Sequence, residues 1–464
     1  MAVFSLSYHQ NPWWESKEKI KSDSKIVEYQ EAPLKWQPSD VFALPREKGA
    51  VHMIFGPRQI GKSTALKLLV QKLLLEENLA PKSLFYFNCD AVADREALIE
   101  LVTDYLEWTK TMKQQKYIFL DEISSVKDWP FGIKWLIDSG FGRNITFFLT
   151  GSTSLSLKKS GEYLPGRRGK GKDLLMCPLS FFEFFTLFYP ELQKIKLKEL
   201  KTKRPAVFWQ EFQDSYPDLQ EKINFFFISG GFPKVINDFY QRKQVSPDTV
   251  NLYQAWVRSA LAKAEKKEFL AKSILQKLFT SLTTGVSYQG VAQFADLGSH
   301  NTARDYLEFL KETFLILEAP FFDIHQKKHL WRKNKKYYFL DPFIFWLLSS
   351  FISGVENLKV LQKDLFAGAE GTSKFIENLV ATELYKNKIQ SFYFSNKGEV
   401  DFVFEKDGFG IEVKYQDKVV PADYPTLRKL KKGIVVSKKD FYQEENVFVI
   451  PLQAFLLLYF PLQP

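Results

Sequence analysis

The chain has 464 residues, which exceeds what one ordinary hydrophobic core supports, so we expect about two to four domains. Hydrophobic residues make up 45% of it and charged residues 25%, which is normal for a folded, soluble protein. The net charge is +10, which suits a polyanionic partner such as nucleic acid and equally suits a lysine-rich surface kept for solubility.

The cysteines and the apolar runs exclude several other classes of protein. Cys89 and Cys177 each lie in an apolar stretch, without a second cysteine at metal-ligand spacing. A disulfide framework and a zinc site are therefore not expected, and this cysteine usage fits a reducing cytoplasm. The N-terminus lacks the features of a signal peptide, and no segment reaches about 18 uninterrupted apolar residues. We therefore predict a cytoplasmic protein with no membrane partner.

Hydrophobic patterning divides the chain into five parts. After a polar leader, four apolar runs (AVHMIFG, SLFYFNCD, YIFLDE and NITFFLTGS) alternate with helical stretches, which predicts an α/β unit around a parallel sheet. Amphipathic helices interrupted by the loop SGGFP then predict a helical subdomain. Short helices and two strands around a basic loop come next, followed by a second α/β pattern with strands near 391–394, 400–404, 409–414 and 433–436. The predicted boundaries are 1–40, 41–180, 181–267, 268–345 and 346–464.

A glycine-rich loop follows the first apolar run and opens a helix. Its sequence GPRQIGKST has the spacing GxxxxGK[ST], in which glycines let successive backbone N–H groups curl around phosphates at a helix N-terminus. The alternative is an accidental glycine-rich turn, but the strand–loop–helix context favours a P-loop. The predicted nucleotide-binding residues are Gly56, Pro57, Arg58, Gln59, Ile60, Gly61, Lys62, Ser63 and Thr64.

The chemistry of ATP hydrolysis assigns roles to some of these residues and to a later strand end. Lys62 would reach the β- and γ-phosphates, and the hydroxyl of Ser63 would bind Mg²⁺. The strand YIFL ends in Asp121 and Glu122, which suit outer-shell magnesium binding and polarisation of the attacking water. The same pair could instead be a helix cap. The predicted cofactors are ATP and Mg²⁺.

Three further polar residues are predicted to act at the ATP site. Thr150 ends the strand NITFFL and could sense the γ-phosphate or the attacking water. Arg167 and Arg168 lie in the loop LPGRRGKGK and could stabilise transition-state charge, in the same subunit or from a neighbour. A solvated basic loop is the alternative for either arginine.

Several motifs together resemble those of one protein family. NPWW at 11–14, GPRQIGKST, LDEI, LTGS, GRR, CPLSFFEFF and GGFP follow one another as in bacterial and archaeal AAA-family ATPases that carry a C-terminal domain of unknown function. The resemblance implies an AAA+-like ATPase core with a helical lid, then a winged helix and a nuclease-like end. It also favours a homo-oligomer, because AAA-type sites often use a neighbour's arginine. It implies no biological role.

The fourth part fits a helix-turn-helix followed by a wing. Ser299 can cap the helix NTARDYLEFLKE, whose exposed face would offer His300, Asn301 and Arg304 to a DNA groove. The wing loop QKKHLWRKNKK is dense in cations that suit contacts with DNA phosphates. A protein-docking role for this module is the alternative. The predicted loop contacts are Lys327, Lys328, Arg332, Lys333, Lys335 and Lys336.

The C-terminal part holds an acidic motif on two strands. In EVDFVFEKDGFGIEVKY, Asp401 lies on one strand, while Glu412 and Lys414 share a face of the next. With Glu377 on the preceding helix, these positions resemble the PD-(D/E)xK nuclease constellation, although Val400 replaces the usual proline. The resemblance implies a second Mg²⁺ or Mn²⁺. An accidental D…ExK pattern and an inactive remnant are the alternatives.

Three functions remain open on this basis. The first is an ATP-hydrolysing switch or motor that binds DNA, duplex or branched, and remodels it without cutting. The second is a metal-dependent DNA endonuclease coupled to the ATPase. The third is a signalling or regulatory NTPase whose winged helix binds protein.

Overall fold

The computed structural model describes residues 2–152, 166–194, 205–396, 398–405 and 408–459. These residues form two compact units. Unit 1 comprises Met1–Cys177 with Glu312–Phe314, and unit 2 comprises Pro178–Lys311 with Leu315–Pro464.

Unit 1 is built on a five-stranded parallel sheet. Its order is β2-β3-β4-β1-β5, so β1 lies between β4 and β5. Four strands coincide with the predicted apolar runs, whose side chains are buried on both faces as expected for a covered parallel sheet. The bounds are β1 Val51–Phe55, β2 Leu84–Asn88, β3 Lys116–Asp121, β4 Ile145–Gly151 and β5 Asp173–Leu175.

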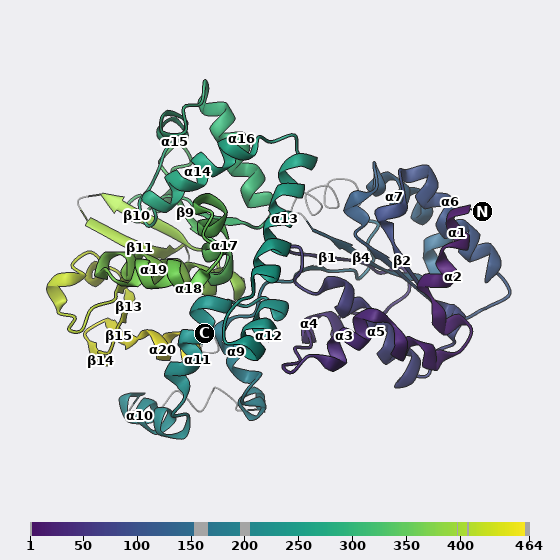
Figure 1. The fold of residues 1–464 in the computed structure, drawn as a ribbon, viewed down its shortest axis with the longest axis horizontal. Helices are drawn as coiled ribbons and strands as arrows, with labels where there is room; N and C mark the ends of the chain where they lie inside the picture. The colour runs from purple at the N-terminus through teal and green to yellow at the C-terminus, as the bar shows by residue number, and fades with distance from the viewer. Residues whose placement is uncertain (1, 153–165, 195–204, 397, 406–407, 460–464) are drawn as a thin grey trace. The chain divides into compact units, whose positions relative to one another are not determined.

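Helices cover both faces of this sheet (Figure 1). On one face α5 (Lys62–Leu75) packs with α3 (Ser24–Glu31) and α4 (Ser39–Phe42), while α6 (Arg95–Trp108) and α7 (Trp129–Asp138) cover the other. The P-loop joins β1 to α5, so it lies at the carboxyl edge of the sheet, where ligands bind in open α/β folds.

The residues predicted to form a separate leader belong to unit 1 and cover its edge strand β2. The side chain of Asn11 donates to the carbonyl of Tyr86 and accepts from its N–H, both at 2.7 Å. The indoles of Trp13 and Trp14 both donate to the carbonyl of Leu84. The leader prediction is therefore corrected, because NPWW supplies the partners that an exposed strand edge would otherwise lack.

The described residues in the first part of unit 2 form helices. The described helices are α9 (Phe181–Thr186), α10 (Pro205–Ser215), α11 (Leu219–Ser229), α12 (Pro233–Arg242) and α13 (Pro247–Lys263). Three more follow: α14 (Glu268–Thr280), α15 (Tyr288–Phe294) and α16 (His300–Glu312). The hydroxyl of Ser299 accepts from the N–H of Asn301, as predicted for the cap of α16.

Two short antiparallel strand pairs come after α16. Strand β6 (Ile316–Ala319) pairs with β9 (Lys336–Phe339), and β7 (Phe322–Asp323) pairs with β8 (Lys328–His329). A single bridge between Val286 and Lys335 extends the first pair. The helices α17 (Pro342–Ser353), α18 (Leu358–Phe366) and α19 (Ala369–Lys386) complete this region.

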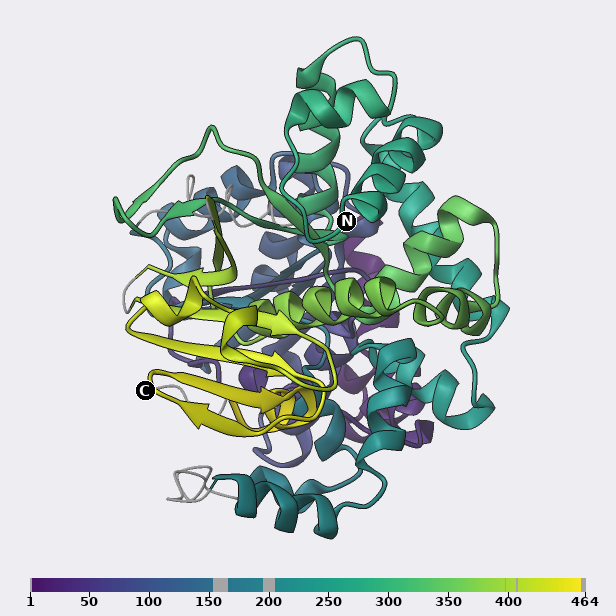
Figure 2. The ribbon, with the colours of Figure 1, turned by 90° about the vertical axis from the view of Figure 1, so that its left-hand side faces the viewer.

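The C-terminal sheet has six strands in the order β10-β11-β12-β13-β15-β14, and α19 runs across it (Figure 2). Strands β12, β13 and β15 are parallel neighbours, and the outer pairings are antiparallel. The bounds are β10 Phe392–Asn396, β11 Gly398–Phe404, β12 Phe409–Lys414, β13 Lys432–Ser437, β14 Tyr442–Glu444 and β15 Val447–Pro451.

The hairpin β7–β8 shares its core with this sheet. Phe321 and Phe322 are buried in one apolar cluster with Phe392, Phe394 and other strand residues. The predicted boundary at residue 345 therefore does not separate two independent cores, because burying these rings joins the hairpin to the sheet.

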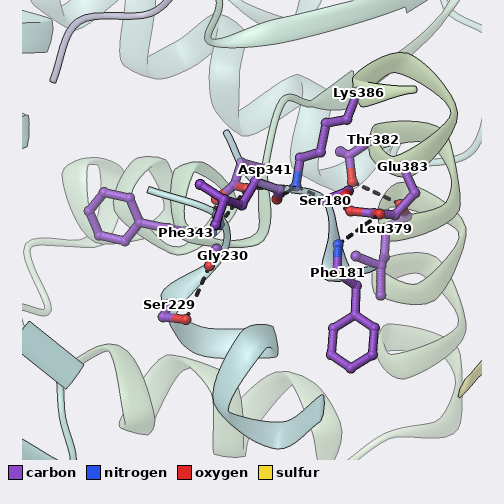
Figure 3. Close-up of polar contacts among 12 residues, drawn as sticks. Ser180, Phe181, Ser229, Gly230, Asp341, Phe343, Leu379, Thr382, Glu383 and Lys386 are labelled. Carbon is purple, nitrogen blue, oxygen red and sulfur yellow. Dashed lines mark hydrogen bonds and ion pairs between the residues drawn. The ribbon is translucent and has the colours of Figure 1, made fainter. Parts of the chain in front are cut away.

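A buried ion triad of Asp341, Glu383 and Lys386 links three segments of unit 2 (Figure 3). The ammonium of Lys386 lies 2.9 Å from Asp341 and 3.2 Å from Glu383, and it also donates to the carbonyl of Leu179. Gly230, in the predicted SGGFP loop, has φ +55, and a Cβ there would lie 1.7 Å from Asp341. Glycine is therefore required at this position.

Among the described residues, no single helix has the length and apolarity needed to cross a bilayer. Only the pair α17 and α18, which meet at a bend of 100°, meets that criterion together.

Candidate functional site

The P-loop lies close to the backbone of Met176 in unit 1. The N–H of Met176 donates to the carbonyl of Phe55 at 2.8 Å, which continues the β1–β5 ladder up to the loop. A Cβ on Gly56 would lie 2.1 Å from the carbonyl oxygen of Met176, so only glycine fits there. Gly61 takes a left-handed conformation, with φ +97, immediately before α5 begins. These two glycines shape the turn that the motif requires.

Lys62 is the first residue of α5 and is held inside the loop. Its ammonium donates to the carbonyls of Gly56 and Pro57 at 3.0 and 2.9 Å. It also lies 3.8 Å from Glu122. Burial lowers the pKa of Lys62, and the carboxylates of Glu122 and Asp121 oppose that shift. The lysine thus faces the predicted water-activating group across the loop.

Asp121 and Thr150 meet at the ends of the neighbouring strands β3 and β4. Both are fully buried, and the hydroxyl of Thr150 donates to Asp121 at 2.5 Å. The same hydroxyl accepts the N–H of Glu122 at 2.8 Å. One threonine hydroxyl therefore connects the two acidic residues, which strand order permits because β4 lies between β3 and β1.

Glu122 has a backbone conformation that is unusual for a residue with a side chain. Its φ is +52, in the left-handed region, which costs about 1 kcal/mol or more and persists only where surrounding contacts impose it. Its carbonyl accepts from the hydroxyl of Ser125 at 2.8 Å. The turn leaves the side chain 21% exposed beside Lys62, where it can reach a water molecule.

Tyr86 is a residue of this site that sequence reasoning missed. It lies on β2, and its hydroxyl donates to the second carboxylate oxygen of Asp121 at 2.7 Å. Burial, and then the adjacent Asp121, raise the pKa of Tyr86, so the phenol remains a donor. The ammonium of Lys67 lies 3.6 Å from the centre of its ring and 3.0 Å from Asp23. Nothing in the sequence indicates this contact, because it depends on β2 being the neighbour of β3.

We expect Tyr86→Phe to leave the Asp121 carboxylate less firmly positioned, because the hydrogen bond from the Tyr86 hydroxyl is lost. The substitution leaves one buried carboxylate oxygen without its donor, which costs about 1–3 kcal/mol in unfolding free energy. We also expect the Mg²⁺ concentration for half-maximal ATP turnover to rise. Tyr105→Phe is the matched control, since it removes a buried hydroxyl that bonds the carbonyl of Lys82 in the same unit. Equal effects on magnesium dependence from both variants would contradict a positioning role for Tyr86.

The two predicted arginines do not lie at the P-loop edge. Arg168 pairs with Asp173 at 2.8 Å, at the start of β5, and its guanidinium lies 3.4 Å from the carbonyl of Val51, at the start of β1. Arg167 pairs with Asp138, at the end of α7, at 2.7 Å. These are the amino ends of the strands, opposite the P-loop. Action on the ATP of the same subunit is therefore not supported by this arrangement.

Arg58 contributes another contact within the loop. Its guanidinium lies 3.4 Å from the hydroxyl of Ser152, just beyond β4. Ser63 and Thr64, in the first turn of α5, are half-buried at the same edge of the sheet. The P-loop residues and both carboxylates thus lie together at one edge of the sheet.

The predicted nuclease-like residues also converge, in unit 2. Glu377 on α19 and Asp401 on β11 both contact the ammonium of Lys336 at 3.1 Å. Glu412 and Lys414 pair at 2.9 Å on β12, as their shared face predicted. The second oxygen of Asp401 accepts the N–H of Val413 at 2.9 Å. Burial, more than the neighbouring Asp401, raises the pKa of Glu377 to about 8.

Lys336 was predicted to contact DNA, and the structure corrects that prediction. It is only 1% exposed and forms ion pairs with Glu377, Glu399 and Asp401. It follows the exposed loop directly, but as the first residue of β9 its side chain points into unit 2 instead of toward solvent.

The other predicted DNA contacts remain accessible. Asn301 and Arg304 are exposed on α16. We call the loop cations other than Lys336 the basic segment. Trp331 lies among them and is 61% exposed, which the sequence analysis did not single out. The basic segment comprises Lys327, Lys328, Arg332 and Lys333, which are exposed, and Lys335, which is half-buried.

Comparisons with known proteins agree with the fold of unit 1. Residues 48–185 match a family described as an AAA domain. Residues 220–356 and 372–455 match two families described as domains of unknown function, DUF8612 and DUF4143. An uncharacterized protein of Methanocaldococcus jannaschii is 24% identical over 416 residues, which cover 85% of this chain and 83% of that protein.

Two of the solved structures that match part of this chain are the following. The Aeropyrum pernix ORC2 protein, in its ADPNP–ADP complexes, is 14% identical, with a TM-score of 0.37 over 66% of this chain and 88% of that one. The Thermotoga maritima RuvB Holliday junction branch migration motor is 14% identical, with a TM-score of 0.29 over 58% of this chain and 82% of that one. The parallel sheet and the P-loop of unit 1 lie within the residues 48–185 that match the family described as an AAA domain.

Proposed function

We propose that this chain hydrolyses ATP in unit 1 and that the hydrolysis cycle changes its affinity for DNA. The DNA is not cut. The observation that carries the ATPase part is the contact set that joins Lys62, Glu122, Thr150 and Asp121 at one edge of the sheet. Each of these residue types performs a distinct task in phosphoryl transfer.

The residues present fit ATP with Mg²⁺. Asp121 is a buried carboxylate held by two hydroxyl donors, and Ser63 offers a hydroxyl in the first turn of the adjacent helix. These two would hold the metal, which supplies charge neutralisation at the phosphates. Lys62 would leave the loop carbonyls for the terminal phosphates, and Glu122 would orient the attacking water.

Thr150 is placed to report the state of the nucleotide. Its hydroxyl donates to the carboxylate of Asp121 and accepts from the backbone N–H of Glu122, so it contacts both residues at the end of β3. We infer that loss of the γ-phosphate changes the hydrogen bonds of this hydroxyl, and so the position of the end of β4.

The basic segment carries the DNA part of the proposal. Its four exposed cations flank Trp331 along the chain, and an exposed aromatic ring in a cationic segment suits stacking on an unpaired base next to phosphate contacts. Branched DNA offers both unpaired bases and dense phosphates. The exposed face of α16, with Asn301 and Arg304, would add contacts in a groove.

Neutralising the basic segment is expected to weaken DNA binding most at low salt. The triple variant Lys327→Gln, Lys328→Gln, Lys333→Gln removes up to three phosphate contacts, so the slope of log affinity against log salt should fall by up to about three. Fluorescence anisotropy with labelled duplex and branched DNA measures both quantities. The matched control replaces Lys429, Lys431 and Lys432, three exposed lysines of the same unit, and should change little. Equal losses in both variants would show non-specific charge attraction.

One experiment separates the three candidate functions. ATP turnover is measured with and without duplex, branched and single-stranded DNA, and the DNA is then examined on a gel after incubation with Mg²⁺ or Mn²⁺. Turnover stimulated by intact DNA supports the switch, whereas cleavage that Asp401→Ala abolishes supports the endonuclease. Absence of DNA binding together with a stable protein partner supports the regulatory NTPase.

The same turnover measurement tests for a homo-oligomer. Arg167 and Arg168 lie away from the P-loop of their own unit. This position suits a role in stabilising transition-state charge on the ATP of a neighbouring copy. Turnover per chain should then rise with protein concentration, and a constant value would count against the oligomer.

A further inference from the structure

We propose that Lys336 is the resident cation of the Glu377–Asp401 site, and that this site binds no divalent metal while Lys336 occupies it. An ammonium group has three N–H donors. Lys336 has three carboxylate partners, at 3.1 Å (Glu377), 2.8 Å (Glu399) and 3.1 Å (Asp401). The ammonium donates hydrogen bonds to Glu377 and Asp401, and Glu399 adds an ion pair.

The distances are those of an ammonium site. Mg²⁺ needs oxygen ligands at about 2.0–2.1 Å in octahedral geometry, and Ca²⁺ needs them at about 2.3–2.6 Å. Among the described residues, no three acidic, histidine or cysteine side chains are arranged to hold a metal ion. The residues of the nuclease-like constellation therefore do not fit the metal that the motif implies.

The remaining carboxylate atoms are largely occupied as well. Tyr338 donates to the same oxygen of Glu377 that Lys336 contacts, at 2.7 Å. The second oxygen of Asp401 accepts a backbone N–H from β12, and one oxygen of Glu412 pairs with Lys414. A metal ion would have to displace these donors.

Charge also disfavours a divalent ion in this arrangement. The carboxylates of Glu377 and Glu412 are both buried. Lys336 and Lys414 place two positive groups beside them. The second oxygen of Glu412 is buried without a hydrogen-bond partner, and it is the one atom here that a metal ion would satisfy.

The consequence is that Lys336 joins β9 to α19 and β11 through its ion pairs with Glu377, Glu399 and Asp401. Lys336 lies on β9, which pairs with β6, whereas its partners lie on α19 and β11. Withdrawing Lys336 would expose three carboxylates and create a metal site that the native arrangement lacks.

Terbium luminescence tests this proposal directly, because tyrosines lie beside the site. Tyr338 contacts Glu377, and the ring of Tyr393 lies 5.6 Å from the ammonium of Lys336, so either can sensitise bound Tb³⁺. The full chain is used with Asp121→Asn in every sample, which removes the acidic ligand at the ATP site. Tb³⁺ is titrated, and Mn²⁺ is then added in competition.

We expect the parent to show no saturable emission that depends on Asp401. Lys336→Met should gain one such site, with an affinity for Tb³⁺ at least about tenfold above the parent's background. The reason is that the substitution frees carboxylate oxygens, which hard cations prefer as ligands. Adding Asp401→Asn should remove it. Lys335→Met, which changes the half-buried neighbour, should behave as the parent.

Two outcomes would overturn the proposal. One is saturable emission from the parent that Asp401→Asn abolishes, and the other is a folded Lys336→Met variant that gains no site. Circular dichroism and the melting temperature report folding. Should Lys336→Met not fold, Lys336→Gln replaces it, and the parent titration still decides whether the native site takes a metal.

Discussion

Replacing Glu122 by Gln is expected to lower ATP turnover by about two to four orders of magnitude while ATP binding is retained. The amide keeps the size and hydrogen-bonding shape of the side chain but cannot accept a proton from the attacking water. The backbone bonds from Glu122 to Thr150 and Ser125 do not involve the side chain, so the turn at the end of β3 should persist.

Single-turnover hydrolysis and equilibrium binding of a fluorescent ATP analogue separate the two effects. Glu107→Gln is the matched control, since this glutamate is exposed on α6 in the same unit. Turnover of Glu122→Gln within a few-fold of the parent would remove Glu122 from the proposed role. A loss of ATP binding of the same size would point instead to a collapse of the contact with Lys62.

Replacing Lys386 by Met is expected to lower the unfolding free energy of unit 2 by about 3–5 kcal/mol, because it leaves two fully buried acidic groups without their cation. Burial alone would lower the pKa of Lys386, but Asp341 and then Glu383 raise it, which shows that the carboxylates hold the charged form. Asp341 also accepts the N–H groups of Gly231 and Phe343, and Glu383 accepts that of Phe181 (Figure 3). The loss would therefore loosen three backbone segments at once.

Urea unfolding followed by circular dichroism measures this loss. Lys374→Met is the control on the same helix, because its pairing with Glu370 is at the surface and contributes at most about 1 kcal/mol. Adding Glu383→Gln to Lys386→Met should recover part of the stability, since one unpaired buried charge is removed. A loss below about 1 kcal/mol for Lys386→Met would contradict the structural role of the triad.

The ATP site could be predicted from the sequence to an unusual extent. Gly56, Gly61 and Lys62 lie within seven consecutive residues, and their spacing alone implies a phosphate-binding turn. Asp121 and Glu122 follow an apolar run, which predicts a strand end. In a parallel sheet all such ends meet at one edge, so their convergence with the P-loop could be inferred without coordinates.

The nuclease-like site shows the opposite case. The positions of Glu377, Asp401, Glu412 and Lys414 were predicted, but the group that faces them was not. Lys336 lies 41 residues from Glu377 and 65 from Asp401 along the chain, inside a run of cations that appears uniform in the sequence. Only the pairing of β9 with β6 turns this one lysine inward, while Lys333 stays exposed.

The P-loop, its two acidic partners and the parallel sheet of unit 1 could be predicted from the chain, because they depend on local spacing and on strands buried on both faces. Which residues support them depends on how distant strands pack together. Tyr86 reaches Asp121 because β2 neighbours β3, Thr150 joins Asp121 to Glu122 because β4 neighbours β3, and Arg168 lies at the far ends of β1 and β5. Strand order and side-chain direction are set by packing among segments that are distant in the sequence. Local sequence patterns therefore do not predict them.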